Sequence, residues 1–249
     1  KLEKIFTQVK KLKVIVVGDA MIDSYKIGEI NRQSPEADVP IVDIVEKSSK
    51  LGGAANVILN LKQLGVNPIL CTVIGDDESG KDIIKKLEKN NLETSGVVID
   101  PSRKTTVKER IIVNSKHVLR IDEEIDNNLK EITRSKLLSK INEKVKTSDI
   151  LIFQDYNKGV IDNVLIDKIT SKKKIFISVD PKHKNFTDYK NIDVFKPNLN
   201  EITKSLKIDN PTLENLQRIG KRFMNKNSIN NLMITLSEKG IIILSEKEF

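Results

Sequence analysis

The chain has 249 residues, long enough to bury a substantial core as one large domain or two small ones. Hydrophobic residues make up 38% of it and charged residues 31%, the balance of an ordinary soluble globular protein. Lysine and arginine number 43 against 35 acidic residues, so the net charge of +8 favours anionic partners. Because the lysines are spread along the chain and only 4% of residues are aromatic, phosphorylated metabolites explain this charge at least as well as nucleic acid, and no nucleic-acid partner is predicted.

Cysteine content and hydropathy indicate where the protein works. The single cysteine, Cys71, excludes an internal disulfide and fits a reducing compartment. No apolar run approaches the roughly 20 residues that are needed to cross a bilayer. The first residues contain no apolar signal core. We therefore expect a cytoplasmic protein with no membrane partner.

The first elements expected along the chain are an amphipathic helix over residues 1–11 and a buried β-branched strand over 14–17. Short apolar runs predict further buried strands at 69–74, 150–153, 175–179, 194–195 and 232–235. Helical patterns lie between most of these runs, at 54–64, 80–90, 128–146, 162–170 and 213–225. More irregular strand candidates occur at 39–45, 106–113 and 118–121.

Strands that alternate with helices indicate an open, parallel sheet covered on both faces. Polar residues follow several of these strands directly, at 18–19, 154–155, 180–182 and 197–198. Ligands of such sheets bind outside the carboxyl ends of the strands, so we expect these residues to gather at one working edge. The strands within 36–47 and 104–121 break the rhythm and predict a small sheet that stands off the main layer. No linker divides the chain, so a single domain over residues 1–249 is expected.

A glycine pair, Gly52 and Gly53, comes directly before the helical pattern of residues 54–64. Glycines let the backbone approach a ligand closely, and the free amides of the first helical turn point at whatever lies there. With Asn56 beside those amides, the stretch suits a polyhydroxylated or anionic small molecule. The alternative is a plain loop-to-helix turn in which the glycines only relieve steric crowding.

Several motifs in a fixed order resemble the ribokinase-like (phosphofructokinase-B) family of sugar kinases over almost the whole chain. They are Gly18-Asp19 with Asp23, the 52–56 turn, Gly75-Asp76-Asp77, Asn198-x-x-Glu201 and the 235–240 turn. The resemblance implies an α/β fold, a three-layer α/β/α sandwich with a central, mostly parallel sheet and a small β lid. It also implies ATP and Mg²⁺ as cofactors.

Within that family the chain is most similar to the kinases of D-glycero-D-manno-heptose 7-phosphate. Residues 31–40 (NRQSPEADVP) resemble their R-x-S-P-E-A-P-V-P segment, with Asp38 in place of a proline. Residues 120–122, 155–159 and 180–182 are similar to their R-L-D, D-Y-x-K-G and D-P-K segments. The likeness implies phosphorylation of the anomeric hydroxyl to heptose 1,7-bisphosphate, on the route to ADP-heptose for lipopolysaccharide. The alternatives are another sugar or sugar-phosphate kinase of the family, or a non-catalytic binder of sugar or nucleotide.

The sequence departs from the family pattern at its end. The G-A-G-D segment, whose aspartate acts as general base and whose amides stabilise the transferred phosphate, does not occur before Phe249. We expect that base beyond Phe249 and interpret the chain as a kinase domain that lacks its C-terminal catalytic segment.

The predicted substrate site combines hydroxyl-binding and phosphate-binding residues. Asp19, Asp23 and Asn56 can hydrogen-bond to sugar hydroxyls, although Asp23 also suits a turn or helix start. Five cations are candidates for the substrate's phosphate, each with a solvated surface role as the alternative. Of these we favour Arg120, which apolar residues flank. The full set is Asp19, Asp23, Arg32, Gly52, Gly53, Asn56, Lys108, Arg110, Arg120, Asp155 and Lys158.

The predicted ATP site lies on later strands. It comprises Asp180, Lys182, Asn198, Leu199, Asn200, Glu201, Thr235, Ser237 and Gly240. Glu201 would hold Mg²⁺ through water, and the alternative is a capping box with Asn198. His117 and His183 have no partners at zinc-ligand spacing. The edges of the extra strands further predict a homodimer formed through the lid.

Overall fold

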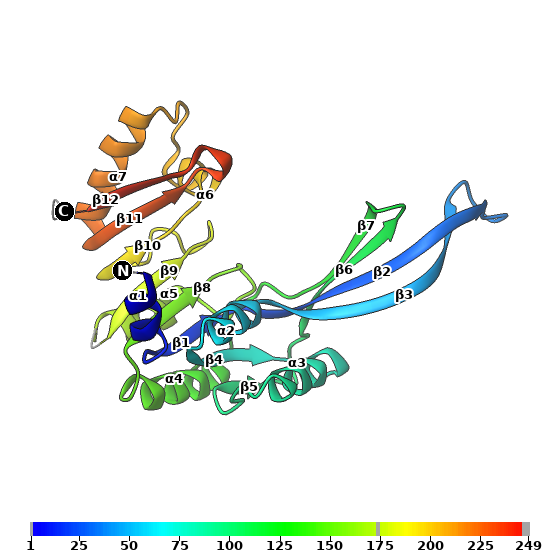
Figure 1. The fold of residues 1–249 in the computed structure, drawn as a ribbon, viewed down its shortest axis with the longest axis horizontal. Helices are drawn as coiled ribbons and strands as arrows, with labels where there is room; N and C mark the ends of the chain where they lie inside the picture. Colours follow the sequence, from blue (N-terminus) through cyan, green and yellow to red (C-terminus); the bar gives the residue numbers. More distant parts are fainter. Residues whose placement is uncertain (1, 173–174, 246–249) are drawn as a thin grey trace.

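A single eight-stranded sheet forms the centre of the computed structural model, which describes residues 2–172 and 175–245 (Figure 1). Its order is β12-β11-β10-β9-β8-β1-β4-β5. All neighbours are parallel except the antiparallel pair β11 and β12. The strands are β1 (Lys13–Gly18), β4 (Asn67–Ile74), β5 (Val97–Ile99), β8 (Ile150–Gln154), β9 (Phe176–Asp180), β10 (Ile192–Phe195), β11 (Ile229–Thr235) and β12 (Ile241–Ser245).

Helices cover both faces of this sheet, because successive side chains along its strands point alternately into two hydrophobic cores. In β1, Ile15 and Val17 belong to the core beneath α4–α7, whereas Val14 and Val16 belong to the core beneath α2 and α3. The predicted three-layer α/β/α arrangement is therefore confirmed. The helices are α1 (Leu2–Val9), α2 (Ala54–Gln63), α3 (Glu78–Lys89), α4 (Glu131–Val145), α5 (Asn163–Thr170), α6 (Leu199–Leu206), α7 (Leu213–Asn227) and the 3₁₀ turn η1 (Ser237–Lys239).

A second sheet extends from the body as a long arm (Figure 1). Its order is β3-β2-β6-β7, formed by β2 (Ala20–Gln33), β3 (Pro40–Gly53), β6 (Thr106–Val113) and β7 (Lys116–Glu123). β2 pairs with β6 only as far as Gly28, so beyond that residue β2 and β3 form a two-stranded ribbon. We call the four strands the lid.

The lid is larger than the sequence predicts. The prediction missed β2 altogether, and β3 continues to Gly53, so the glycine pair ends a strand instead of forming a turn of its own. The reason lies in β2, whose apolar residues Ile22, Ile27 and Ile30 do not keep to one face, so no alternation marks the strand. β5 was missed as well, because its three residues are too few to show a pattern.

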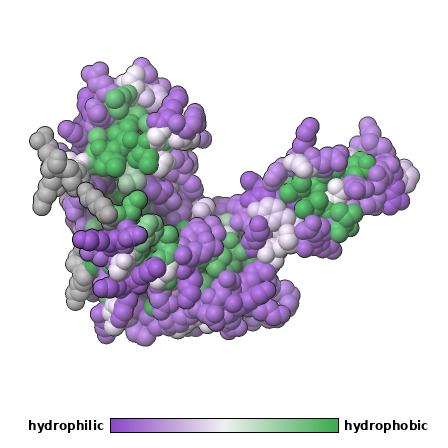
Figure 2. All heavy atoms as spheres, in the orientation of Figure 1, coloured by the Kyte–Doolittle hydropathy of each residue, from purple (hydrophilic) through white to green (hydrophobic). Residues whose placement is uncertain are grey.

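Some apolar side chains are exposed on the surface of the molecule. Figure 2 shows hydrophobic residues on the lid and near β11 and β12, where Ile241 and Ile243 are more than half exposed. Within residues 2–172 and 175–245, none of the helices has the length and apolar character that a bilayer crossing requires.

Candidate active site at the lid and the strand ends

Asp19 follows β1 and is almost completely buried at the working edge of the sheet. Its carboxylate accepts three backbone N–H groups, from Tyr156 at 2.8 Å, Lys158 at 3.2 Å and Val160 at 3.0 Å. A sugar hydroxyl would have to displace these donors to reach it. In this structure Asp19 shapes the loop after β8, and its contact with a sugar stays a prediction.

Asp23 lies at the root of the lid, where its carboxylate is partly exposed. Arg110 of β6 donates to it at 2.7 Å and lies 5.4 Å from the ring centroid of Tyr25. Gly52 is the neighbour of Asp23 on β3, and a β-carbon there would lie 2.3 Å from the Asp23 carboxylate. Gly53, at φ +57°, leaves room for the Asp19 carbonyl, which accepts the amide of Ala54 at 2.9 Å.

Asn56 stands in the first turn of α2 and lines one pocket together with Asp23. The pocket has a volume of about 510 Å³. Side chains of Tyr25, Lys50 and Leu59 also line it. The structure therefore brings together the glycine pair, Asp23 and Asn56, as the sequence-based hypothesis requires.

Three predicted phosphate-binding cations, in the lid and in the loop after β8, are already paired with carboxylates. Lys108 lies 3.4 Å from Asp122 and 3.5 Å from Glu124, and Lys158 lies 2.6 Å from Glu124. Arg120, the favoured candidate, contacts Asp122 at 2.9 Å and keeps 58% of its side chain exposed. Each of these cations would have to exchange a carboxylate for a phosphate.

Arg32 is not brought to this site within one copy of the chain. It lies nine residues beyond Asp23 on the same strand, a span of about 30 Å at the rise of a β-strand. Its guanidinium instead lies 3.5 Å from Asp43 across the ribbon. Arg32 is therefore remote from Asp23 in a single chain, because the strand β2 that separates the two residues was not foreseen, and its role in binding substrate stays a prediction.

Asp155 is also buried and committed to protein donors. It accepts hydrogen bonds from the Asn157 amide at 2.8 Å, Asn185 at 2.9 Å and the Tyr189 hydroxyl at 3.1 Å. Burial raises its pKa, against the effect of these donors. Like Asp19, it supports the loop after β8, and its contact with substrate stays a prediction.

The predicted nucleotide-side residues lie at the ends of β9, β10 and β11. Lys182 forms an ion pair with the buried Glu201 and lies 5.7 Å from the Tyr156 ring centroid. Burial lowers the pKa of Lys182, but the hydrogen bond and charge of Glu201 outweigh this effect and raise it. Asp180 lies 3.1 Å from Lys196.

Asn198 connects these strand ends to α6. Its side chain accepts the Glu201 amide at 2.8 Å, while Glu201 accepts the Asn198 amide at 2.8 Å, which makes a complete capping box. Leu199 and Asn200 form the first turn between them. Asn198 also pairs with Thr235 of β11, and the turn through Ser237 and Gly240 returns to β12, so the predicted residues form one contiguous edge.

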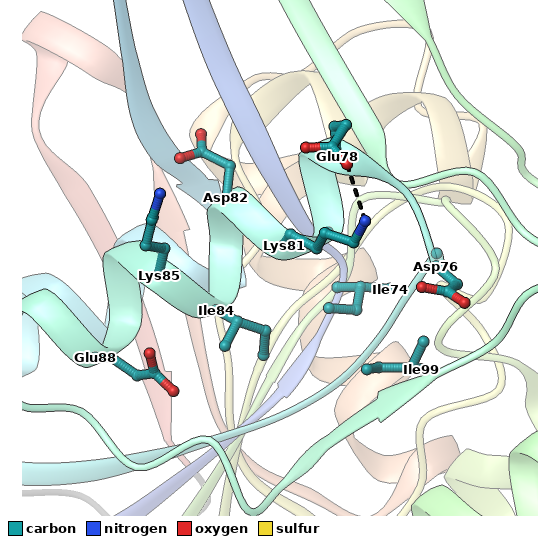
Figure 3. Close-up of a pocket in the computed structure, with 11 residues that line it drawn as sticks. Ile74, Asp76, Glu78, Lys81, Asp82, Ile84, Lys85, Glu88 and Ile99 are labelled. Carbon is teal, nitrogen blue, oxygen red and sulfur yellow. Dashed lines mark hydrogen bonds and ion pairs between the residues drawn. The ribbon is translucent and has the colours of Figure 1, made fainter.

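A separate cavity of about 630 Å³ lies on the other side of α3 (Figure 3). Ile74, Ile84 and Ile99 supply its apolar part. Lys81 and Lys85 are among its charged residues, and Lys81 pairs with Glu78. None of the predicted sugar or nucleotide residues lines it.

Comparison with known proteins identifies the family. The pfkB family of carbohydrate kinases matches residues 11–249. The chain belongs to this family. Membership confirms the resemblance to ribokinase-like sugar kinases and the prediction of a phosphotransferase.

Curated relatives match at the level of sequence. The chain is 39% identical to the "Bifunctional protein HldE" of Helicobacter acinonychis (strain Sheeba) over 239 residues, which are 95% of this chain and 52% of that protein. It is 37% identical to the protein of the same name from Aliarcobacter butzleri (strain RM4018), over 95% of this chain and 50% of the relative. The chain thus spans about half the length of the curated relatives it matches.

Solved structures confirm the fold. Escherichia coli phosphofructokinase-2 in complex with fructose-6-phosphate matches with a TM-score of 0.74 at 16% identity, over 95% of this chain and 78% of that chain. Ribokinase from Thermotoga maritima matches with a TM-score of 0.64 at 19% identity, over 95% of this chain and 76% of that chain.

Within residues 2–172 and 175–245, no cluster of three or more His, Cys, Asp or Glu side chains is arranged to hold a metal ion. Mg²⁺ usually binds one or two carboxylates together with phosphates and water, so it does not require such a cluster. Both oxygens of Glu201 accept protein donors, so this carboxylate fits an ion that is contacted through water.

Asp19 gives this pfkB domain a predicted pH dependence of stability. Burial, with the neighbouring Asp155 charge, raises its pKa from 3.8 to about 6, against three backbone donors that lower it. Between these values the folded chain binds more protons than the unfolded one, so this group's contribution falls as pH rises from about 4 to 6, by at most about 3 kcal/mol.

Denaturant unfolding of the natural chain and of Asp19→Asn at pH 4, 5, 6 and 7 measures this term. We expect the unfolding free energy of the natural chain, minus that of Asp19→Asn, to fall as pH rises towards 6. Groups that both proteins share cancel in this difference. A difference that stays constant over the range would contradict the assignment.

Several residues of the site escaped sequence analysis. Tyr25 lies on a strand that was not predicted, and Glu124 follows the lid without a motif. Lys86 and Lys89 do carry a signal, because they share a helix stripe with Asp82 at i, i+4 and i+7. The sequence alone does not show that this stripe lies beside β3, so it could not be assigned to the site.

Proposed function

We propose that the chain is the sugar-kinase part of an enzyme that transfers the γ-phosphate of ATP to the anomeric hydroxyl of D-glycero-D-manno-heptose 7-phosphate. The product would be the heptose 1,7-bisphosphate used for ADP-heptose and lipopolysaccharide. The observation that carries this proposal is the similarity to proteins named HldE over 95% of the chain. The resemblance of the segments at 31–40, 155–159 and 180–182 to heptose 7-phosphate kinases supports it.

The geometry supports a site for the sugar between the lid and the strand ends. Asp23 and Asn56 line one pocket and present a carboxylate and an amide to sugar hydroxyls. Asp19 holds the 156–160 loop, which keeps Tyr156 and Lys158 beside the lid. In phosphoryl transfer most of the rate comes from positioning and electrostatics, which is what such an arrangement supplies.

ATP would lie along the edge formed by Lys182, Asn198, Glu201 and the 235–240 turn. Lys182 and the amides of the first turn of α6 are donors for nucleotide phosphates. Mg²⁺, when bound with ATP, neutralises charge on the transferring phosphate. Glu201 would meet it through water. The general base stays a prediction: the aspartate of a G-A-G-D segment beyond Phe249.

A coupled ADP-release assay on the full-length natural protein tests the proposal. Heptose 7-phosphate should give the highest kcat/KM in a panel that includes fructose 6-phosphate and ribose. If another sugar were clearly preferred, the heptose assignment would be wrong and a different kinase activity of the family would replace it. Nucleotide or sugar binding without any turnover would favour the non-catalytic alternative.

We further propose that two copies pair through their lids. The strand register puts Ile30, Ile44, Leu119 and Ile121 on the lid face opposite Asp23, and all four are exposed by 37% or more. Near the body, Ile22 on the same face is buried against the core beneath α2 and α3. A two-stranded ribbon is only marginally stable alone, so its bare apolar face favours a partner.

Sedimentation velocity of the full-length protein should therefore show a dimer, and Leu119→Lys with Ile121→Lys should shift it to monomer. Burying a lysine without a partner is costly, whereas an exposed lysine is not. Far-ultraviolet circular dichroism controls for folding of the variant. A wild-type monomer at micromolar concentration would contradict the proposal.

A further inference from the structure

Lysines surround the pocket that holds Asp23 and Asn56. Lys50 of β3 and Lys86 and Lys89 of α3 all line this cavity of about 510 Å³. The groups suited to sugar hydroxyls and the three lysines therefore share one space.

The lysines of α3 face this space because of helix periodicity. Asp82, Lys86 and Lys89 lie at i, i+4 and i+7, so they form one stripe. The stripe lies beside the edge strand β3, because Ser49, on the lid face opposite Asp23, donates a hydrogen bond to Asp82 at 3.3 Å. The pocket therefore extends around the edge of β3, with Lys50 and Asp23 on one face and the α3 lysines on the other. Lys85 belongs to a different stripe and lines the separate cavity of Figure 3.

The pocket carries an excess of positive charge. Lys86 lies 3.0 Å from Asp82, the one carboxylate that pairs with any of the three lysines within the described parts of the chain. Lys50 lies 5.7 Å from the Tyr25 ring centroid. One oxygen of the Asp23 carboxylate forms an ion pair with Arg110. On the lid face that carries Asp23, by contrast, Lys108 and Arg120 are each paired with a carboxylate, as is Lys158 of the loop after β8.

We propose that Lys50, Lys86 and Lys89 bind the phosphate group that the sugar substrate already carries, while Asp23 and Asn56 hold its hydroxyls. This proposal rests on the function proposed above and names the part of the site that selects a phosphorylated sugar. A phosphate dianion is best met by several charge-assisted donors, and these lysines offer them without first breaking three ion pairs. In this arrangement Arg120 is not needed for the phosphate.

The test compares Lys86→Met/Lys89→Met with Lys85→Met in the full-length natural protein. Methionine keeps the apolar stem and removes the charge. We expect KM for heptose 7-phosphate to rise about tenfold or more in the double variant, as two donors to a dianion are lost. KM for ATP and turnover of unphosphorylated heptose should stay unchanged, and Lys85→Met should match the natural protein in every assay.

A binding measurement tests the inference even if the protein shows no turnover. Binding of inorganic phosphate, followed by calorimetry, should weaken in the double variant and not in Lys85→Met. Natural protein that turned over no sugar phosphate would refute the proposed function, and the phosphate titration would still decide this inference. Unchanged KM and unchanged phosphate binding, or an equal loss for both sugars, would overturn it.

Discussion

Gly52→Ala should lower kcat/KM for the sugar by about a hundredfold, because the added methyl group would occupy the position of the Asp23 carboxylate. A β-carbon at residue 52 would lie 2.3 Å from that carboxylate and 2.9 Å from Met21. The contact with the Cγ of the buried Met21 is less severe, and Asp23 is held at 2.7 Å by Arg110. Loss of a charge-assisted hydrogen bond to substrate costs about 1.5–3 kcal/mol, which sets the size of the effect.

The same substitution should also destabilise the fold by about 1–3 kcal/mol, the usual cost of overpacking. Asp23→Ala provides the matched control, because it removes the group with which the new methyl collides. In the Asp23→Ala background only the 2.9 Å contact with Met21 remains, so adding Gly52→Ala should cost less stability than it does in the natural protein and little further activity, and the two substitutions should be non-additive. Additive losses would show that Gly52 acts through something other than Asp23.

The relation between Gly52 and Asp23 illustrates what the sequence leaves out. Both residues were predicted to bind sugar, yet their direct contact depends on the register of β2 against β3, which pairs Asp23 with Lys50 and Met21 with Gly52. Because β2 has no regular alternation of apolar residues, neither the strand nor its register can be inferred from local pattern. For the same reason the remoteness of Arg32 was not foreseen.

The central sheet, in contrast, was predictable because its parallel strands are buried on both faces. Runs such as 14–17 and 150–153 are almost wholly apolar, as expected for strands between two helical layers. The polar residues that end these strands were placed correctly at one edge. What the sequence cannot show is how each one is held: burial and hydrogen bonds make Asp19 and Asp155 support a loop, whereas Asp23 lines a pocket.

Glu201→Ala should destabilise the protein by about 2–4 kcal/mol, because it removes a capping-box side chain and the partner of Lys182 together. Glu201 is 4% exposed, accepts the Asn198 amide at 2.8 Å and forms the ion pair with Lys182. Lys182 keeps 33% of its side chain exposed, so water can solvate part of its charge, and the loss should fall short of that for a fully buried pair. Denaturant unfolding at pH 7 measures it.

Glu201→Gln separates the structural role of this residue from a role with magnesium. Glutamine can still accept the Asn198 amide, so it should keep the cap and lose less stability than alanine. If Glu201 also holds magnesium through water, Glu201→Gln should raise the Mg²⁺ concentration needed for half-maximal turnover in the full-length enzyme. An unchanged Mg²⁺ dependence, with stability reduced in both variants, would assign Glu201 to the capping box and the Lys182 ion pair alone.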